Sequence, residues 1–129
     1  PTPGGPTKQR ICERASGRIL AYLSGVGAVT DAVRRAVEDA DCVFFDGTFW
    51  SSDELPGLGL GTKRAEQMAH LPVGGPDGSL ARLHGLAAPR RIFIHVNNTN
   101  PLLRDDSPER TTVEAAGWEV ARDGLEVRI

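Results

Sequence analysis

The segment of residues 91–101 constrains the fold most, because it is a short apolar run that stops abruptly at a histidine. Residues 92–94 are β-branched or aromatic and predict a buried strand. Amide and hydroxyl side chains follow at once, and Pro101, which has no N–H to donate, ends the strand. His95 is therefore expected at the carboxyl end of a strand, where ligands bind in open α/β sheets.

A second apolar run has the same design. Residues 42–45 end at Asp46, which Gly47, Thr48, Phe49 and Trp50 follow. A carboxylate at one strand end and an imidazole at another are the ingredients of a metal site or of an acid/base pair. The alternative is that Asp46 only begins an Asp-Gly turn and that His95 is a structural histidine.

The chain around these two runs predicts an α/β fold. Residues 18–23 form a plausible strand, and Thr30 can cap a helix that extends to about residue 40. This order of strand, helix and strand favours a parallel pair. Residues 51–78 are rich in Pro and Gly and predict a long loop, with one helical turn at residues 64–68. The loop holds His70, either as a functional residue or as an exposed loop histidine.

The remaining elements follow from capping and turn signals. Ser79 can cap a helix through residue 86, with His84 on its wetter side. Ser107 precedes a proline that suits a helix start, and Gly117 suits its end. Residues 118–121 and 125–129 alternate around an Asp-Gly pair and predict a hairpin. Residues 1–17 read as a flexible leader or linker, and residues 18–129 as the folded part.

Composition narrows the possible partners. With 129 residues, 40% hydrophobic and 25% charged, the chain is expected to form one domain with an ordinary core. Its formal net charge of −2 gives no case for nucleic acid or an anionic membrane as the main partner. No apolar run approaches a membrane span, no signal peptide is visible, and Cys12 and Cys42 do not suggest a disulfide scaffold. We therefore expect a cytoplasmic protein.

Several sequence blocks resemble one family in particular. They are Ala-Asp at residues 40–41, Phe-Phe-Asp-Gly-Thr-Phe-Trp at 44–50, Asp-Glu at 53–54, Met-Ala-His at 68–70, Ile-Phe-Ile-His-Val-Asn-Asn-Thr-Asn-Pro at 92–101, Asp-Ser-Pro-Glu-Arg at 106–110, Ala-Ala-Gly at 115–117 and Asp-Gly at 123–124. Together they make residues 18–129 similar to the carboxyl-terminal part of the pyrroloquinoline quinone (PQQ) biosynthesis protein B family, within the metallo-β-lactamase superfamily.

The resemblance implies a fold and a set of site residues. The fold is part of a metallo-β-lactamase-like αββα sandwich, with the site at the loop edge of its sheets. Asp46 and His95 match metal-ligand positions, with iron(II) as the first choice and zinc as the alternative. His70 matches a position that faces the substrate pocket or the metal, as an acid/base group or a further ligand. The resemblance also suggests that Asn97, Asn98 and Asn100 orient the imidazole and its loop and that Trp50 walls the substrate.

The implied function is a late step of PQQ biosynthesis. It is an iron-dependent hydroxylation of the tyrosine ring of a peptide-derived Glu-Tyr precursor. One alternative is a zinc-dependent hydrolase of the same fold. Another is a non-catalytic fragment or binding module, including a role in transport of PQQ or its precursor.

Two departures from the family pattern bear on these expectations. The His-x-His-x-Asp-His block of the superfamily and the amino-terminal cysteine cluster of the family belong to a half that is absent from this chain. A half-sandwich leaves one sheet face uncovered, so we expect a homo-oligomer or pairing with an amino-terminal half. The other departure is Ala69, which stands where the family has glycine; if that position requires a positive φ, alanine is strained there.

Overall fold

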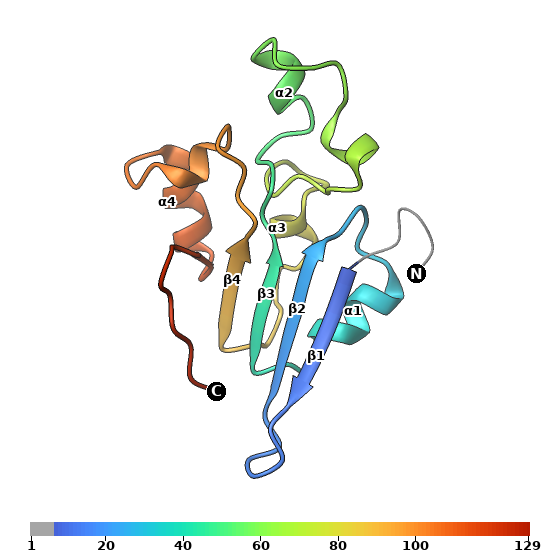
Figure 1. Cartoon of the computed structure of the whole chain (residues 1–129), viewed down its shortest axis with the longest axis vertical. Helices are drawn as coiled ribbons and strands as arrows, with labels where there is room; N and C mark the ends of the chain where they lie inside the picture. The colour runs from blue at the N-terminus through green and yellow to red at the C-terminus, as the bar shows by residue number, and fades with distance from the viewer. Residues whose placement is uncertain (1–6) are drawn as a thin grey trace.

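A computed structural model describes residues 7–129 and contains a five-stranded sheet in the order β1-β2-β3-β4-β5 (Figure 1). Its strands are β1 (Thr7–Cys12), β2 (Ile19–Gly25), β3 (Cys42–Asp46), β4 (Arg90–Ile94) and β5 (Glu119–Val120). β1 pairs antiparallel with β2, and every later pair is parallel. The three predicted strands that became β2, β3 and β4, and the parallel pairing of the first two, are confirmed.

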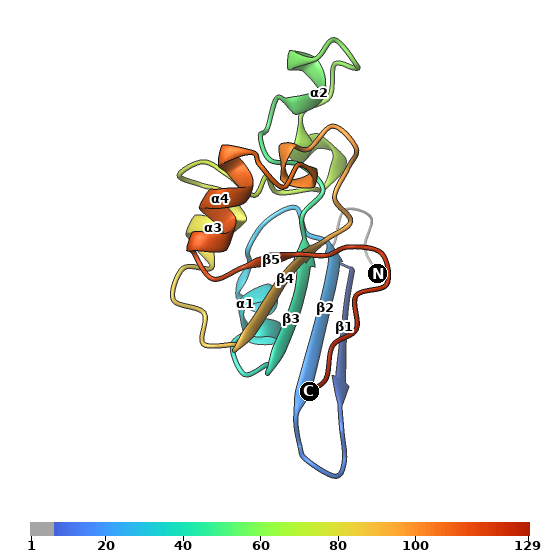
Figure 2. The same ribbon diagram turned by 90° about the vertical axis from the view of Figure 1, so that its left-hand side faces the viewer.

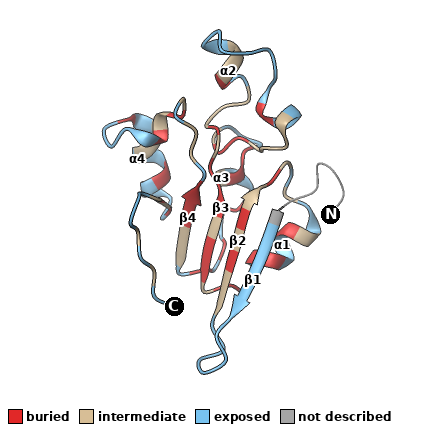
Figure 3. Ribbon diagram, in the orientation of Figure 1, coloured by how far each residue is buried: buried red, intermediate tan, exposed pale blue. Residues whose placement is uncertain are grey.

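Strand β1 corrects the prediction of a flexible leader. Its register pairs Cys12 with Ile19 and Lys8 with Leu23, at the outer edge of the sheet. Residues 8–12 of this strand are exposed, so no alternating apolar pattern marks it in the sequence (Figure 3). The prediction is therefore wrong for residues 7–12, and residues 1–6 of the predicted leader lie outside the described part of the chain.

The helices that cover the sheet begin at the predicted caps, with one exception. In α1 (Asp31–Val37) the Thr30 hydroxyl accepts from the Val33 N–H at 3.2 Å. In α4 (Pro108–Ala115) the Ser107 hydroxyl accepts from the Arg110 N–H at 3.0 Å, and Gly117 follows the helix with φ +86°. α3 (Ser79–Arg82) is shorter than the predicted 79–86, and its cap is Gly78 rather than Ser79.

Shorter elements lie in the loops beyond the carboxyl ends of the strands. They are α2 (Glu54–Gly57) and the 3₁₀ helices η1 (Ala65–Met68) and η2 (Pro101–Leu103). η1 confirms the predicted helical turn. The lobe that contains α2 projects from the top of the molecule (Figure 1), and its Leu58 and Leu60 are exposed.

The predicted carboxyl-terminal hairpin is wrong. Only residues 119–120 form a strand, which lies parallel to β4, and residues 125–129 do not return along it. Instead, Leu125, Val127 and Ile129 pack on the opposite face of the sheet from the helices (Figure 2). The alternating apolar pattern therefore reflects burial against that face and not pairing with a neighbouring strand.

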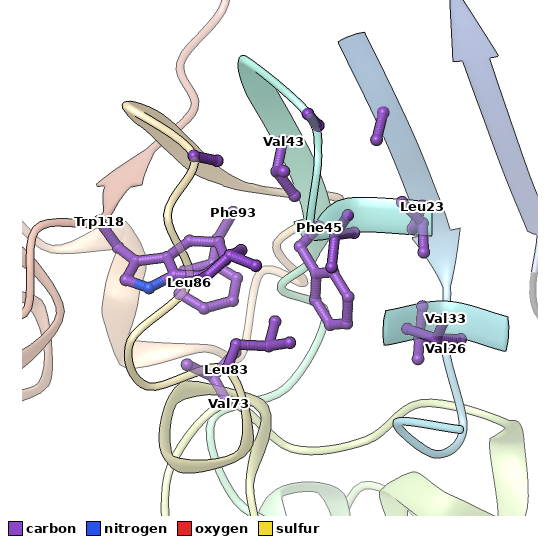
Figure 4. Packing of buried hydrophobic residues seen from close by; sticks show 14 of the residues in the cluster. Leu23, Val26, Val33, Val43, Phe45, Val73, Leu83, Leu86, Phe93 and Trp118 are labelled. Carbon is purple, nitrogen blue, oxygen red and sulfur yellow. The ribbon is translucent and has the colours of Figure 1, made fainter. Parts of the chain in front are cut away.

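The main core lies between the sheet and the layer formed by α1, α3 and α4 (Figures 2 and 4). Phe93 and Trp118 stack at its centre with ring centroids 4.1 Å apart. The labelled members of this core are Leu23, Val26, Val33, Val43, Phe45, Val73, Leu83, Leu86, Phe93 and Trp118. The α/β fold class is confirmed. Among residues 7–129, no helix is long and apolar enough to cross a membrane.

Candidate functional site

The candidate site begins where β3 and β4 end side by side. Asp46 and Ile94 are register partners, and the Gly47 N–H donates to the Ile94 carbonyl at 2.8 Å. A Cβ at Gly47 would lie 2.8 Å from the Cβ of Phe93, so only glycine allows this approach. Asp46 is thus the last residue of β3, and His95 directly follows the last residue of the adjacent β4, as the sequence predicted.

Asp46 is 1% exposed and its carboxylate accepts four hydrogen bonds. Oδ2 accepts from the Val26 N–H at 2.9 Å and contacts His70 Nδ1 at 2.7 Å. Oδ1 accepts from the Thr48 N–H at 3.0 Å and from the Thr48 hydroxyl at 2.6 Å. Since backbone N–H groups only donate, both carboxylate oxygens are held as acceptors.

His70 is the residue that the structure brings to Asp46, although 24 positions separate them. A carboxylate with these partners is an acceptor, so His70 must donate its Nδ1–H, and Nε2 then carries the free lone pair. The edge of the Phe49 ring packs against the imidazole, with centroids 5.9 Å apart. His70 is a quarter exposed, so an oriented imidazole reaches the surface at this edge.

Ala69 explains how His70 is aimed. It lies in the left-handed region with φ 60° and ψ 37°, immediately after η1, and its φ confirms the expected conformation at this position. The flanking backbone is fixed by the His70 N–H, which donates to the Ala65 carbonyl, and by the Leu71 N–H, which donates to the Val26 carbonyl. Alanine in this conformation costs about 1 kcal/mol relative to glycine.

His95 follows the last residue of β4, beside the end of β3. Its backbone turns sharply with φ 58°, and its exposed side chain lines a pocket of about 360 Å³ with Ala121, Arg122 and Asp123. No hydrogen bond or ion pair joins His95 to Asp46 or His70 in the described structure. Within residues 7–129, no three His, Cys, Asp or Glu side chains are grouped closely enough to hold a metal.

Two of the three predicted asparagines, Asn97 and Asn100, join the loop after β4 to the loop after β3. Asn100 is 2% exposed; its amide donates to the Gly47 carbonyl at 2.9 Å and its Oδ1 accepts from the Leu102 N–H. The Asn97 N–H donates to the Thr48 carbonyl at 3.0 Å. Asn98 is exposed. None of the three has a hydrogen bond to His95 in the described structure, so any orienting effect on this imidazole passes through the loop.

Trp50 packs against the main core and also lines a pocket. It is half-buried and lies over Gly74, where an added Cβ would meet its ring at 2.6 Å. It lines a pocket of about 540 Å³ together with His84, Thr112 and small residues of α3 and α4. This pocket is larger than the one that His95 lines and gives Trp50 room to contact a ligand.

Sequence reasoning missed three residues of this edge. Thr48 supplies two of the four hydrogen bonds to Asp46, and the Asp-Gly-Thr order is a signal for such a turn. Glu54 and Thr99 join the two loops, with the Thr99 hydroxyl donating to Glu54 Oε2 at 2.6 Å. Nothing in the local sequence indicates that contact, because 45 positions separate the two residues.

Comparison with known proteins identifies the same family. Residues 10–96 match the β-lactamase superfamily domain. The chain is 47% identical over 112 residues to coenzyme PQQ synthesis protein B of Xanthomonas axonopodis pv. citri, covering 87% of this chain and 38% of that protein. It is 49% identical over 112 residues to the Methylococcus capsulatus protein of the same name, covering 87% of this chain and 37% of the other.

Two solved structures have a similar fold. The chain superposes on Zn(2+)-bound PqqB from Methylobacterium extorquens with a TM-score of 0.86 and 39% identity, over 100% of this chain and 48% of that one. A diphosphatase from the PhnP family matches with a TM-score of 0.54 and 19% identity, over 96% of this chain and 43% of that one, which shows the fold alone. The chain therefore spans less than half the length of these relatives.

Proposed function

The chain belongs to the β-lactamase superfamily, and from this premise we propose that it is the carboxyl-terminal part of a PQQ biosynthesis protein. The observation that carries the proposal is the alignment of its whole length with Zn(2+)-bound PqqB at 39% identity. The proposed reaction is iron-dependent hydroxylation of the tyrosine ring of a peptide-derived Glu-Tyr precursor, and its proposed location is the cytoplasm.

The residues of this chain fit a metal only in part. Asp46 and His95 offer a carboxylate and an imidazole, which suit iron(II) or zinc. The described residues contain no group of three such ligands, and the Asp46 carboxylate contacts four donors, so a metal bound to Asp46 would have to displace one of them. We propose that the remaining ligands come from an amino-terminal half, and that the incomplete site of this chain performs no metal chemistry alone.

His70 is the proposed acid/base group. The Nδ1–H contact with the buried Asp46 carboxylate fixes the imidazole tautomer and stabilises the imidazolium that forms when Nε2 takes a proton. Nε2 is therefore suited to accept the phenol proton of the precursor. Trp50 and the loop that carries Asn97, Asn98 and Asn100 would shape the pocket for the tyrosine ring of the precursor. Iron, when bound, would supply the oxygen activation that zinc cannot.

A chimera tests this proposal. The 112 residues of this chain that align with the Xanthomonas axonopodis protein replace the corresponding segment of that protein, which restores the part of the relative that this chain lacks. With iron(II), oxygen, a reductant such as ascorbate and a cross-linked Glu-Tyr compound, we expect mass spectrometry to show one oxygen atom of O₂ added to the ring, while the other is reduced to water. His70→Ala should lower the rate about 100-fold, whereas Lys63→Ala, at an exposed position outside the Trp50 pocket, should not. A folded, iron-loaded chimera that adds no oxygen would refute the hydroxylase.

A zinc-dependent hydrolase is the second candidate. The structure that superposes over the whole chain is zinc-bound, and the same fold occurs in a diphosphatase. Zinc activates water rather than oxygen. Turnover by the zinc-loaded chimera that continues without oxygen and without a reductant would select the hydrolase over the hydroxylase.

The second face of the sheet is the proposed partner surface. It carries Cys42, Ile92 and Ile94, with Tyr22 and Phe44 only partly buried, and it is covered by residues 125–129 rather than by helices (Figure 2). Since the chain spans 48% of the solved PqqB chain, we propose the amino-terminal half as the occupant. Analytical ultracentrifugation distinguishes pairing with an amino-terminal half from formation of a homo-oligomer. A stable monomer that binds no amino-terminal half would leave only the hypothesis of an independent binding module.

A further inference from the structure

Glu54, the first residue of α2, is a buried acid in an otherwise exposed lobe. Only 8% of the residue is exposed, so an unpaired carboxylate here would be costly. Its two oxygens serve two different segments. Oε1 accepts from the Trp50 N–H at 2.9 Å, in the loop after β3, and Oε2 accepts from the Thr99 hydroxyl at 2.6 Å, in the loop after β4.

The contacts of Glu54 close a ring through both loops. The Asn97 amide donates to the Thr99 hydroxyl at 2.6 Å, and the Asn97 backbone N–H donates to the Thr48 carbonyl at 3.0 Å. The ring therefore passes from Trp50 through Glu54, Thr99 and Asn97 back to Thr48. Asp46 and His95 lie at the starts of the two joined loops, where any change in loop separation moves one relative to the other.

We infer that Glu54 is a positioning residue that clamps the loop after β3 to the loop after β4. It touches neither Asp46 nor His95 and acts on them through Trp50 and Thr99. The inference deepens the proposed function, on which it rests for the roles of Asp46 and His95. A neutral, shorter side chain at position 54 would leave two donors unpaired and let the loops separate.

Amide hydrogen exchange of the full 129-residue chain measures the clamp directly. The Asn97 N–H reports on the gap between the loops, and the Ala121 N–H, which donates to the Phe93 carbonyl at 2.9 Å, reports on the sheet. Glu54→Ala should speed Asn97 exchange about 10- to 100-fold, as expected for a lost hydrogen bond to a charged acceptor. Ala121 exchange should not change. Asp53→Ala is the matched control, since Asp53 is exposed and caps nothing.

A conservative replacement separates the clamp from simple loss of a side chain. In Glu54→Gln the amide oxygen can accept from the Trp50 N–H while its NH₂ donates to the Thr99 hydroxyl, so Asn97 exchange should return to within a few-fold of the original chain. If Glu54→Ala does not fold, Thr99→Val and Thr99→Ser make the same comparison from the other side. Asn97 exchange that is equal in Glu54→Ala and Asp53→Ala, or no rescue by glutamine, would overturn the inference.

A zinc titration distinguishes failure of the clamp from failure of the proposed metal function. Where the chimera with the Xanthomonas axonopodis protein binds zinc, Glu54→Ala should weaken its affinity at least 10-fold and Glu54→Gln should restore it. A chimera that binds no zinc contradicts the metal function, while the exchange rates still decide the clamp. Faster Asn97 exchange with unchanged zinc affinity would refute the positioning role.

Discussion

Replacement of Asp46 by asparagine tests the core of the candidate site. The carboxylate accepts from Val26, from both donors of Thr48 and from His70. Asparagine has one oxygen to keep the Thr48 bonds, and its NH₂ then faces the Val26 N–H and the imidazole. His70 can adapt by moving its proton to Nε2, which lets Nδ1 accept from the new NH₂. The Val26 backbone N–H can only donate, so it loses its partner.

The magnitude follows from what is left unpaired. One buried backbone donor without a partner costs about 1–3 kcal/mol, and loss of a charge-assisted bond adds to this. We expect Asp46→Asn to lower the free energy of unfolding by about 3 kcal/mol, which corresponds to roughly 10 °C in Tm for a chain of this size. Asp77→Asn, at an exposed carboxylate, should leave the stability unchanged.

Two measurements check the substitution. Urea unfolding followed by tryptophan fluorescence gives the stability, and nitrogen NMR of the imidazoles gives the His70 tautomer. The original chain should carry its His70 proton on Nδ1, and Asp46→Asn should carry it on Nε2. Equal stabilities of the two chains, or an Nε2–H tautomer of His70 in the original chain, would refute the claim that the Asp46 carboxylate accepts these four hydrogen bonds.

Two further substitutions and one labelling experiment test other parts of the structure. Ala69→Gly should raise the stability by about 1 kcal/mol because its φ is positive, whereas Ala116→Gly, at φ −82°, should give no gain in the same thermal melt. Burial raises the pKa of the Cys42 thiol, so a thiol reagent should label only the exposed Cys12 in the native chain. The pKa of the Cys42 thiol is higher in the folded chain than in the unfolded chain. The stabilisation that the neutral thiol contributes should therefore be complete below the ordinary pKa of 9.0 and should decline as the pH rises above it. Cys42→Ala should flatten that decline. Rapid native labelling of Cys42, or a less stable Ala69→Gly chain, would contradict these expectations.

The sequence predicted those parts of the fold whose signals are local. β3 and β4 are continuous apolar runs because both of their faces are covered, and Thr30 and Ser107 cap helices with their own hydroxyls. β1 gave no signal because its residues 8–12 are exposed to water. Residues 125–129 gave a misleading signal, because burial against a sheet face produces the same alternation of apolar and polar residues as pairing in a hairpin.

The site was predictable in its residues but not in its contacts. The strand ends identified Asp46 and His95, yet Asp46 pairs with His70. That contact depends on how the long loop folds back, through the left-handed turn at Ala69 and the Leu71 bond to Val26. The contact of Glu54 with Thr99 depends likewise on tertiary packing, which no local pattern encodes.

Metal titration tests the central claim, that this chain contributes Asp46 and His95 to a metal site completed by another segment. Calorimetry is run with zinc, and anaerobically with iron(II), on the chain alone and on its mixture with the amino-terminal part of the Xanthomonas axonopodis protein. We predict weak binding by the chain alone and about one metal per pair with at least 100-fold higher affinity in the mixture, lost in His95→Ala and kept in His84→Ala. Binding that is equally tight without the added part, or that His95→Ala leaves intact, would contradict the account.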